Sequence, residues 1–494
     1  MSHFYKLALL LACTCCALSA QETHDHGVPE KLGSVSFHIS CSPAVQADFN
    51  RGIALLHSFA YAPANAAFQK IAAQDPKCAM AHWAIAMTLF HPLWDLLPAS
   101  SLPAASREIA AAQKIGSSDP RERAYIHAYS LLIESPKSTP FSIRNQHYEQ
   151  AMRDVAEQKN KADVEAKVFY ALALLSNAPP TDKTHTRQKQ ALAILEPLDH
   201  AYPDHPGITH YIIHASDSTE LAPRGLAAAR KYAKLAPAAP HALHMPSHIF
   251  TRLGLWQDSI NSNLAAAQAA RNQHDIGEQL HAMDYLVYAY LQLSQNENAL
   301  HVIDRLKKME SLGMADFKVG YAATAMPVRY AIERRHWDEA ATIAPAPNSP
   351  PQVSAIAVWA HALGRIRGQH TSDPSIELSA LSGYEDQLHR GGNEYWAAQT
   401  GILRQEVLAW SAQASGKPQE AESQMRAAAD QEDAMEKLPV TPGPIVPARE
   451  QLGELLLQQQ RHADAAAAFK ASLVNAPNRR GSISGLHAAE DKHE

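Results

Sequence analysis

Histidine offers the clearest chemistry in this sequence, which has 27 of them among 494 residues. Imidazole is both a metal ligand and a proton carrier near neutral pH. Pro203 and Pro237 lie 34 residues apart, and each is followed by a histidine seven and eleven residues later. These histidines are His210, His214, His244 and His248. Because residues four apart share a helical face, the spacing predicts two imidazole pairs at equivalent places of two helices.

Four further residues extend this candidate site: Asp217, His241, His281 and Asp284. Asp217 continues the first helical stripe, and His281 and Asp284 fall at matching positions of the next predicted helix, which begins near residue 279. Pro246 is tolerated best in the first turn of a helix. We therefore expect that helix to begin near Met245, with His241 and His244 in the preceding turn.

Such a set of side chains suits a divalent transition metal. Imidazole is a ligand for Zn, Cu or Fe, and a carboxylate fills or orients a remaining position. The alternative is that the histidines line a groove for a peptide or small molecule, or bond to backbone carbonyls. His57 and His91, also 34 residues apart, either extend the site or belong to the packed core, and we favour packing.

Small and aromatic residues recur at fixed spacing near both ends of the chain. Gly52, Ala64, Phe68 and Pro76 are matched, 401 residues later, by Gly453, Ala465, Phe469 and Pro477. This pattern resembles the tetratricopeptide repeat, a helix-turn-helix unit of about 34 residues. Degenerate units place a small residue at the start of their second helix: Ser259, Ala299, Ala340 and Ala421. The chain is also similar to secreted bacterial repeat proteins of undefined role.

Composition favours helices, since alanine-rich runs have high helix propensity and β-branched residues are few in them. The resemblance implies an all-α fold, a right-handed superhelical α-solenoid in which stacked units share one core. It also implies that ligands bind on the concave face. The formal charge of −6 is spread along the chain without basic clusters, so we expect no nucleic-acid partner.

The N-terminal segment predicts export. Lys6 precedes an apolar run that closes on Ser19 and Ala20, which is typical of a signal peptide over residues 1–20. The mature protein would be periplasmic or extracellular, and a lipoprotein anchor at Cys13 is the alternative. No other segment is apolar enough to span a membrane. Cys41 and Cys78 then remain as either a disulfide or two free thiols.

We divide the remaining chain into a flexible segment over 21–43, a solenoid carrying the histidines over 44–343, further repeats over 344–478 and a disordered tail over 479–494. Three functions are compatible with the sequence. The first is an exported scaffold that binds a peptide, protein or small ligand and holds a metal. The second is a metal-dependent enzyme using the same cluster, and the third is a metal-free binding scaffold.

Overall fold

The computed structural model describes residues 30–93, 97–157, 163–368 and 373–491. The predicted signal peptide, residues 1–20, lies outside this part. The described residues form one short 3₁₀-helix and 24 α-helices, with no strand among them. The all-α prediction is therefore confirmed. None of these helices is both long and apolar enough to cross a bilayer.

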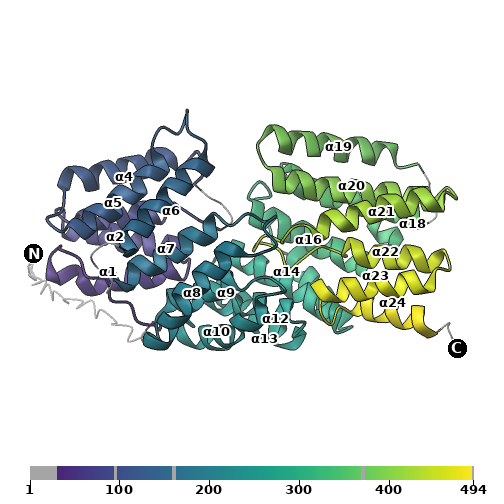
Figure 1. Cartoon of the computed structure of the whole chain (residues 1–494), viewed down its shortest axis with the longest axis horizontal. Coiled ribbons are helices and arrows are strands. Elements are labelled where there is room, and N and C mark those ends of the chain that lie inside the picture. Colours follow the sequence, from purple (N-terminus) through teal and green to yellow (C-terminus); the bar gives the residue numbers. More distant parts are fainter. Residues whose placement is uncertain (1–29, 94–96, 158–162, 369–372, 492–494) are drawn as a thin grey trace, which may run out of the picture.

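Consecutive helices pack as neighbours and build an elongated solenoid, whose two ends lie at opposite sides of the molecule (Figure 1). The first helices are η1 (Pro43–Val45), α1 (Gln46–His57), α2 (Tyr61–Gln74), α3 (Ala79–Met87), α4 (Leu102–Ile115), α5 (Pro120–Ile133), α6 (Phe141–Glu157), α7 (Val164–Ser176) and α8 (Thr186–Ala201). The central ones are α9 (Pro206–Ala215), α10 (Ala222–Leu235), α11 (Pro240–His244), α12 (Pro246–Arg252), α13 (Trp256–Asn272), α14 (Ile276–Gln292), α15 (Asn296–Lys307), α16 (Phe317–Glu333) and α17 (Trp337–Ala340). The last are α18 (Pro351–Arg367), α19 (Ser375–Arg390), α20 (Glu394–Ala414), α21 (Pro418–Asp433), α22 (Ala448–Gln458), α23 (His462–Asn475) and α24 (Arg480–Glu490).

The repeat signature works as a contact between a glycine and an aromatic ring. A Cβ added to Gly52 of α1 would lie 2.4 Å from Cε1 of Phe68 in α2. The same construction on Gly453 of α22 gives 2.6 Å to Cε1 of Phe469 in α23. The absence of a side chain lets each helix pair approach closely. The four degenerate positions are buried as well: Ser259, Ala299, Ala340 and Ala421.

The segment before the first repeat is packed where the structure describes it. Residues 30–42 have no helix, yet Phe37 is fully buried, with ring contacts to Phe49, Trp83 and Tyr125. We expected flexibility here because the segment lacks helical periodicity, but aromatic burial orders it without a helix. A disulfide joins Cys41 to Cys78 and so links this segment to the start of α3.

The C-terminal end also differs from the predicted disordered tail. Residues 480–490 form α24, and Arg479 is buried in ion pairs with Glu333 and Glu450. Trp256 donates from its indole nitrogen to the carbonyl of Asn478 at 2.9 Å. These partners are distant in sequence, so the local pattern gave no sign of them. The core likewise continues across the proposed boundary at residue 344, because one hydrophobic cluster includes both Tyr321 and Val353.

The connection between α21 and α22, residues 434–447, is called the strap below. It runs back to the centre of the molecule (Figure 1). Lys437 of the strap pairs with Asp217 at 2.9 Å. Tyr285 donates to the carbonyl of Thr441 at 3.1 Å, and Arg329 donates to that of Pro444 at 2.8 Å. The strap is therefore bound to the loop after α9, to α14 and to α16.

Candidate metal centre

Six of the predicted histidines come together, from α9, the α11–α12 stretch and α14. They form two triads. The first triad is His210, His214 and His241, and the second triad is His244, His248 and His281. In each triad one ligand nitrogen per residue lies within 4.8 Å of the other two, and all six residues are buried. The structure thus assembles the histidines in two groups where the sequence predicted one.

The division follows from the path of α11 and α12. Met245 has helical backbone angles, φ −52° and ψ −36°, and its N–H donates to the carbonyl of His241 at 2.9 Å. The predicted helix start near Met245 is confirmed, because α12 begins at Pro246 with Met245 as its N-cap residue. The expectation that His241 and His244 lie in a turn is wrong, because both belong to the short helix α11. His241 and His244 are helical and share a stripe with His248. One end of this stripe faces α9 and the other faces α14.

In the second triad the outer nitrogens of two rings are committed as donors. Nδ1 of His248 donates to Oδ2 of Asp217 at 2.9 Å. Nδ1 of His244 donates to Oδ1 of Asn263 at 2.6 Å, and the amide nitrogen of Asn263 donates to the carbonyl of Ser259, which assigns the amide orientation. A neutral imidazole has one donor and one acceptor nitrogen. Both Nε2 atoms are therefore lone-pair acceptors.

These two acceptors face one another, with Nε2 of His244 only 3.0 Å from Nε2 of His248. A proton or a metal cation between them would satisfy both lone pairs. Burial lowers the pKa of His248 to about 4 and the pKa of His244 well below its ordinary value. The charged imidazolium is thus disfavoured near neutral pH, and a cation bound by two neutral rings fits the geometry. The ring of His281 completes the group, with its centroid 4.2 Å from that of His244.

The first triad has outer hydrogen bonds on two of its three rings. Nδ1 of His210 donates to the carbonyl of His57 at 2.6 Å, and its Nε2 is buried without a hydrogen-bond partner. Both ring nitrogens of His214 are also buried without a hydrogen-bond partner. Nδ1 of His241 donates to Oε2 of Glu278 at 3.2 Å. Burial lowers the pKa of His210 and of His214 well below the ordinary value, which favours the neutral, ligand-competent ring.

The two predicted aspartates take other positions. Asp217 contacts the outer nitrogen of His248 and pairs with Arg252 and Lys437 at 2.9 Å each. Burial opposes its ionisation, but Lys437 and Arg252 together hold the pKa of Asp217 well below its usual range. Asp284 lies 3.6 Å from Arg329, and burial raises its pKa to about 6 despite that cation. Neither carboxylate belongs to a triad.

Two residues of the centre were not predicted from the sequence. Asn263 and Glu278 bond to the outer nitrogens of His244 and His241. Glu278 precedes His281 by one helical turn, a spacing that offered a signal. Asn263 offered none, because its partner lies 19 residues away on another helix.

A third histidine cluster is fully bonded. Glu165 accepts from Nε2 of His57 at 2.8 Å and from Nε2 of His205 at 2.9 Å. The remaining nitrogens accept from Tyr211, at 3.0 Å, and from the backbone N–H of Ile208, at 3.2 Å. Since every ring nitrogen has its partner, this group is a structural network. His57 is packed in the core, as favoured, and the ring of His91 lies 4.1 Å from that of Tyr61.

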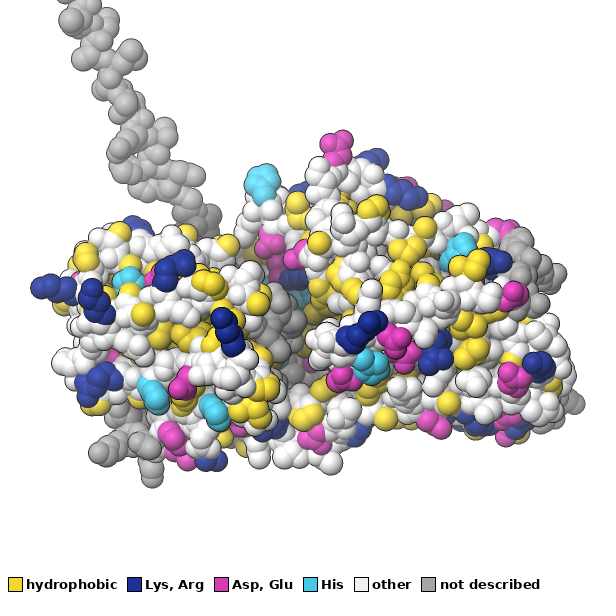
Figure 2. Space-filling view, turned by 90° about the horizontal axis from the view of Figure 1, so that it is seen from above, with side chains coloured by type: hydrophobic (Ala, Val, Ile, Leu, Met, Phe, Trp, Pro, Cys, Tyr) yellow, Lys and Arg dark blue, Asp and Glu magenta, His cyan; other side chains and the backbone are white. Residues whose placement is uncertain are grey.

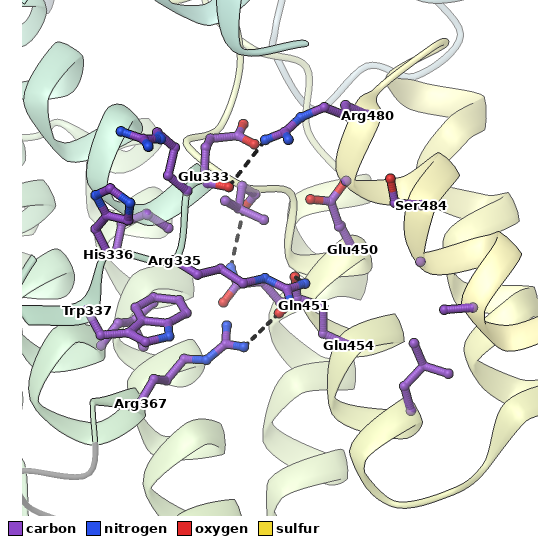
Figure 3. Close-up of a pocket in the computed structure, with 18 of the residues that line it drawn as sticks. Glu333, Arg335, His336, Trp337, Arg367, Glu450, Gln451, Glu454, Arg480 and Ser484 are labelled. Carbon is purple, nitrogen blue, oxygen red and sulfur yellow. Dashed lines mark hydrogen bonds and ion pairs between the residues drawn. The ribbon is translucent and has the colours of Figure 1, made fainter. Parts of the chain in front are cut away.

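Two large cavities open at the surface. One, of about 570 Å³, has His214, Asp217, Trp396 and Lys437 in its wall and so approaches the first triad. The other, of about 580 Å³, is shown in Figure 3. There Glu454 pairs with two arginines of the wall, Arg335 at 3.0 Å and Arg367 at 2.9 Å. Arg335 and Arg367 of this second cavity therefore share the carboxylate of Glu454.

The outer surface has mixed charge. Figure 2 shows basic and acidic side chains interspersed over one face, without a broad area of one sign, and that face is hollowed between the two halves of the molecule.

Neither a protein-family model nor a curated protein matches the sequence. Similar solved structures include a monomeric IFIT1 mutant with m7Gppp-AAAA, with 12% identity, a TM-score of 0.38 and coverage of 84% of this chain and 90% of that one. Another is the P58(IPK) TPR domain, with 14% identity, a TM-score of 0.23 and coverage of 91% and 98%. The chain is an all-α solenoid of tetratricopeptide-like repeats.

Proposed function

We propose that this protein is a metalloprotein, in which the repeat scaffold holds a transition-metal ion through His244, His248 and His281. The observation that carries the proposal is the 3.0 Å contact between Nε2 of His244 and Nε2 of His248. Each ring donates through its other nitrogen to a fixed acceptor, so both facing atoms offer lone pairs. Together with the imidazole of His281, these two oriented rings form a metal-ligand set suited to Zn, Cu or Fe.

A metal-dependent enzyme is the more specific version of this function. It is favoured by the cavity of about 570 Å³ whose wall includes His214 and Asp217, because a small ligand can come near the centre from there. A metal-free peptide-binding groove has less support. The strap already occupies this region, with Tyr285 and Arg329 bonded to its carbonyl groups.

Export belongs to the same proposal. The disulfide between Cys41 and Cys78 supports it, because disulfides persist in oxidising compartments. The leader-like sequence over residues 1–20 is the second support. A periplasmic or extracellular site of action would expose the protein to free metal ions and small molecules.

The test is metal analysis of the full-length protein, purified without a histidine tag after growth with Zn, Cu and Fe. We expect a stoichiometric metal that is lost in both His244→Ala and His248→Ala. His389→Ala, at an exposed histidine, is the control and should retain the metal. Circular dichroism would show whether each variant folds, and His281→Gln provides a milder change. Absence of metal from the folded wild type after all three growths, and after adding each ion in vitro, would overturn the proposal.

A further inference from the structure

We infer that the first triad binds a second metal ion, so that the centre is dinuclear, and that both ions are copper. This inference rests on the proposed function of the second triad and extends it to His210, His214 and His241. Their ligand nitrogens lie within 4.8 Å of one another. They come from two helices, α9 and α11, and α10 packs against both of them.

The polar atoms of the first triad call for a ligand. Leaving a buried polar atom without a hydrogen bond costs about 1–3 kcal/mol. Nε2 of His210 and both ring nitrogens of His214 are buried in this way. By contrast, the cluster of His57, Glu165 and His205 satisfies every ring nitrogen. The cluster of His57 and His205 thus has a hydrogen bond at every ring nitrogen, whereas the first triad keeps ring nitrogens without one.

The two triads are close enough to form one centre. Across them, the ring centroids of His214 and His248 are 6.1 Å apart, and those of His241 and His244 are 6.2 Å apart. Within the first triad, the centroids of His214 and His241 are 6.3 Å apart. The spacing across the triads thus matches the widest spacing within the first triad. Two ions held here would be neighbours, as in the two-metal centres of other enzymes.

Copper follows from the charge of the ligand set. Six imidazoles supply neutral nitrogen donors, and neither triad includes a carboxylate. The nearest carboxylates bond to outer ring nitrogens and are already paired, Asp217 with Arg252 and Glu278 with Lys318. Because burial penalises uncompensated charge, two monovalent Cu(I) ions fit better than two divalent ions. Imidazole is a good ligand for copper. When Cu(I) is oxidised to Cu(II), nitrogen ligands bind the ion more tightly than any other divalent first-row metal.

The decisive experiment is an anaerobic titration of the metal-free, full-length protein with Cu(I), in competition with a chromophoric Cu(I) chelator. We expect two ions per chain in the wild type and one in His214→Ala and His210→Asn. His205→Gln, a buried histidine in the bonded cluster, is the matched control and should retain two. Circular dichroism checks that each variant folds. If His214→Ala is unstable, His210→Asn provides the test, because asparagine keeps a polar group in the site.

The outcomes separate the two proposals. One copper ion in the wild type, unchanged in His214→Ala and lost in His248→Ala, would overturn the dinuclear inference and leave the proposed function intact. No bound metal at all would overturn both. Two zinc ions bound under conditions where copper is not would overturn the assignment of copper. As a second readout, oxidation of the loaded protein with ferricyanide should give a magnetically coupled Cu(II) pair with a weak paramagnetic signal, and His214→Ala should show a full mononuclear Cu(II) signal.

Discussion

At the scale of single residues, a hydrogen bond on the outer nitrogen of an imidazole decides what its inner nitrogen can do. Asp217, Asn263 and Glu278 each accept from the Nδ1 of a triad histidine. Such partners fix both the tautomer and the orientation of a metal-binding ring. Asp217 therefore orients His248, whereas the sequence predicted that Asp217 is a metal ligand.

Asp217→Asn should therefore weaken metal binding without removing a ligand. The variant keeps an oxygen that can accept from His248 but loses the negative charge that supports the ring, so we expect affinity to fall about 10–100-fold with unchanged stoichiometry. Competition titration against a chelator measures this. Asp199→Asn, at a half-buried carboxylate paired with Lys231, is the control. Equal affinities in wild type and Asp217→Asn would contradict the assigned role.

A second prediction concerns Glu406, which is 1% exposed and has a buried oxygen without a hydrogen-bond partner. Burial, together with the nearby charge of Glu432, raises the pKa of Glu406 well above its ordinary value. A raised pKa means that its contribution to stability is complete below the unfolded pKa, about 4.3, and is lost as pH rises. Glu406→Gln should therefore increase the melting temperature at pH 7–8.

The gain from Glu406→Gln should shrink toward zero below about pH 4, where the wild-type carboxyl is protonated in both states. Thermal unfolding across pH 4–8 provides the measurement. Glu420→Gln changes a half-exposed carboxylate and is the control, with a nearly flat difference. A gain that stayed constant with pH would show that ionisation of Glu406 is not its cause.

At the scale of helices, the repeat signature could be predicted from sequence because its contacts are local. Gly52 and Phe68 are 16 residues apart, and their contact sets the approach of α1 and α2. The histidine register was predictable for the same reason, since the 34-residue period places equivalent residues on adjacent helices. The division into triads was not. It depends on how the short helix α11 and the helix α12 after it direct His241, His244 and His248 toward different neighbours, which the local sequence does not specify.

Gly52→Ala should destabilise the protein although alanine is the better helix former. Its methyl group would lie 2.4 Å from the ring of Phe68, and such overpacking costs about 1–3 kcal/mol. Gly383→Ala is the matched control, because this exposed glycine of α19 has nothing within 4 Å of an added Cβ. There we expect a gain of about 0.5–1 kcal/mol in the free energy of unfolding. Chemical denaturation of both variants measures the difference, and a stabilising Gly52→Ala would refute the close contact.

At the scale of the whole molecule, long-range contacts turn an open solenoid into an enclosed centre. Lys437 of the strap reaches Asp217 across 220 residues of sequence, and Asn478 bonds to Trp256 across 222. No repeat period predicts such pairs, which is why the strap and α24 were not foreseen. Near the histidines, the strap contacts Asp217, Tyr285 and Arg329.

Arg329 is a buried side chain that holds the strap through several hydrogen bonds. It is fully buried, donates to the carbonyls of Gly443, Pro444 and Ile445, and pairs with Asp284. Arg329→Met would leave these carbonyls without a donor and a buried carboxyl without its cation. Removing one partner of a buried ion pair costs about 3–5 kcal/mol. If the strap opens locally, about 3 kcal/mol corresponds to at least a 100-fold increase in its open population.

We therefore expect amide hydrogen exchange in residues 438–446 to accelerate about 100-fold in Arg329→Met, and trypsin to cleave after Lys437 much faster. Arg335→Met, which removes an exposed guanidinium paired with Glu454, is the control and should leave both rates unchanged. Arg329→Lys separates charge from geometry, because lysine keeps the cation and loses the planar donor fork. Unchanged exchange and cleavage in Arg329→Met would mean that the strap is held by its other contacts, chiefly those of Lys437 and Tyr285.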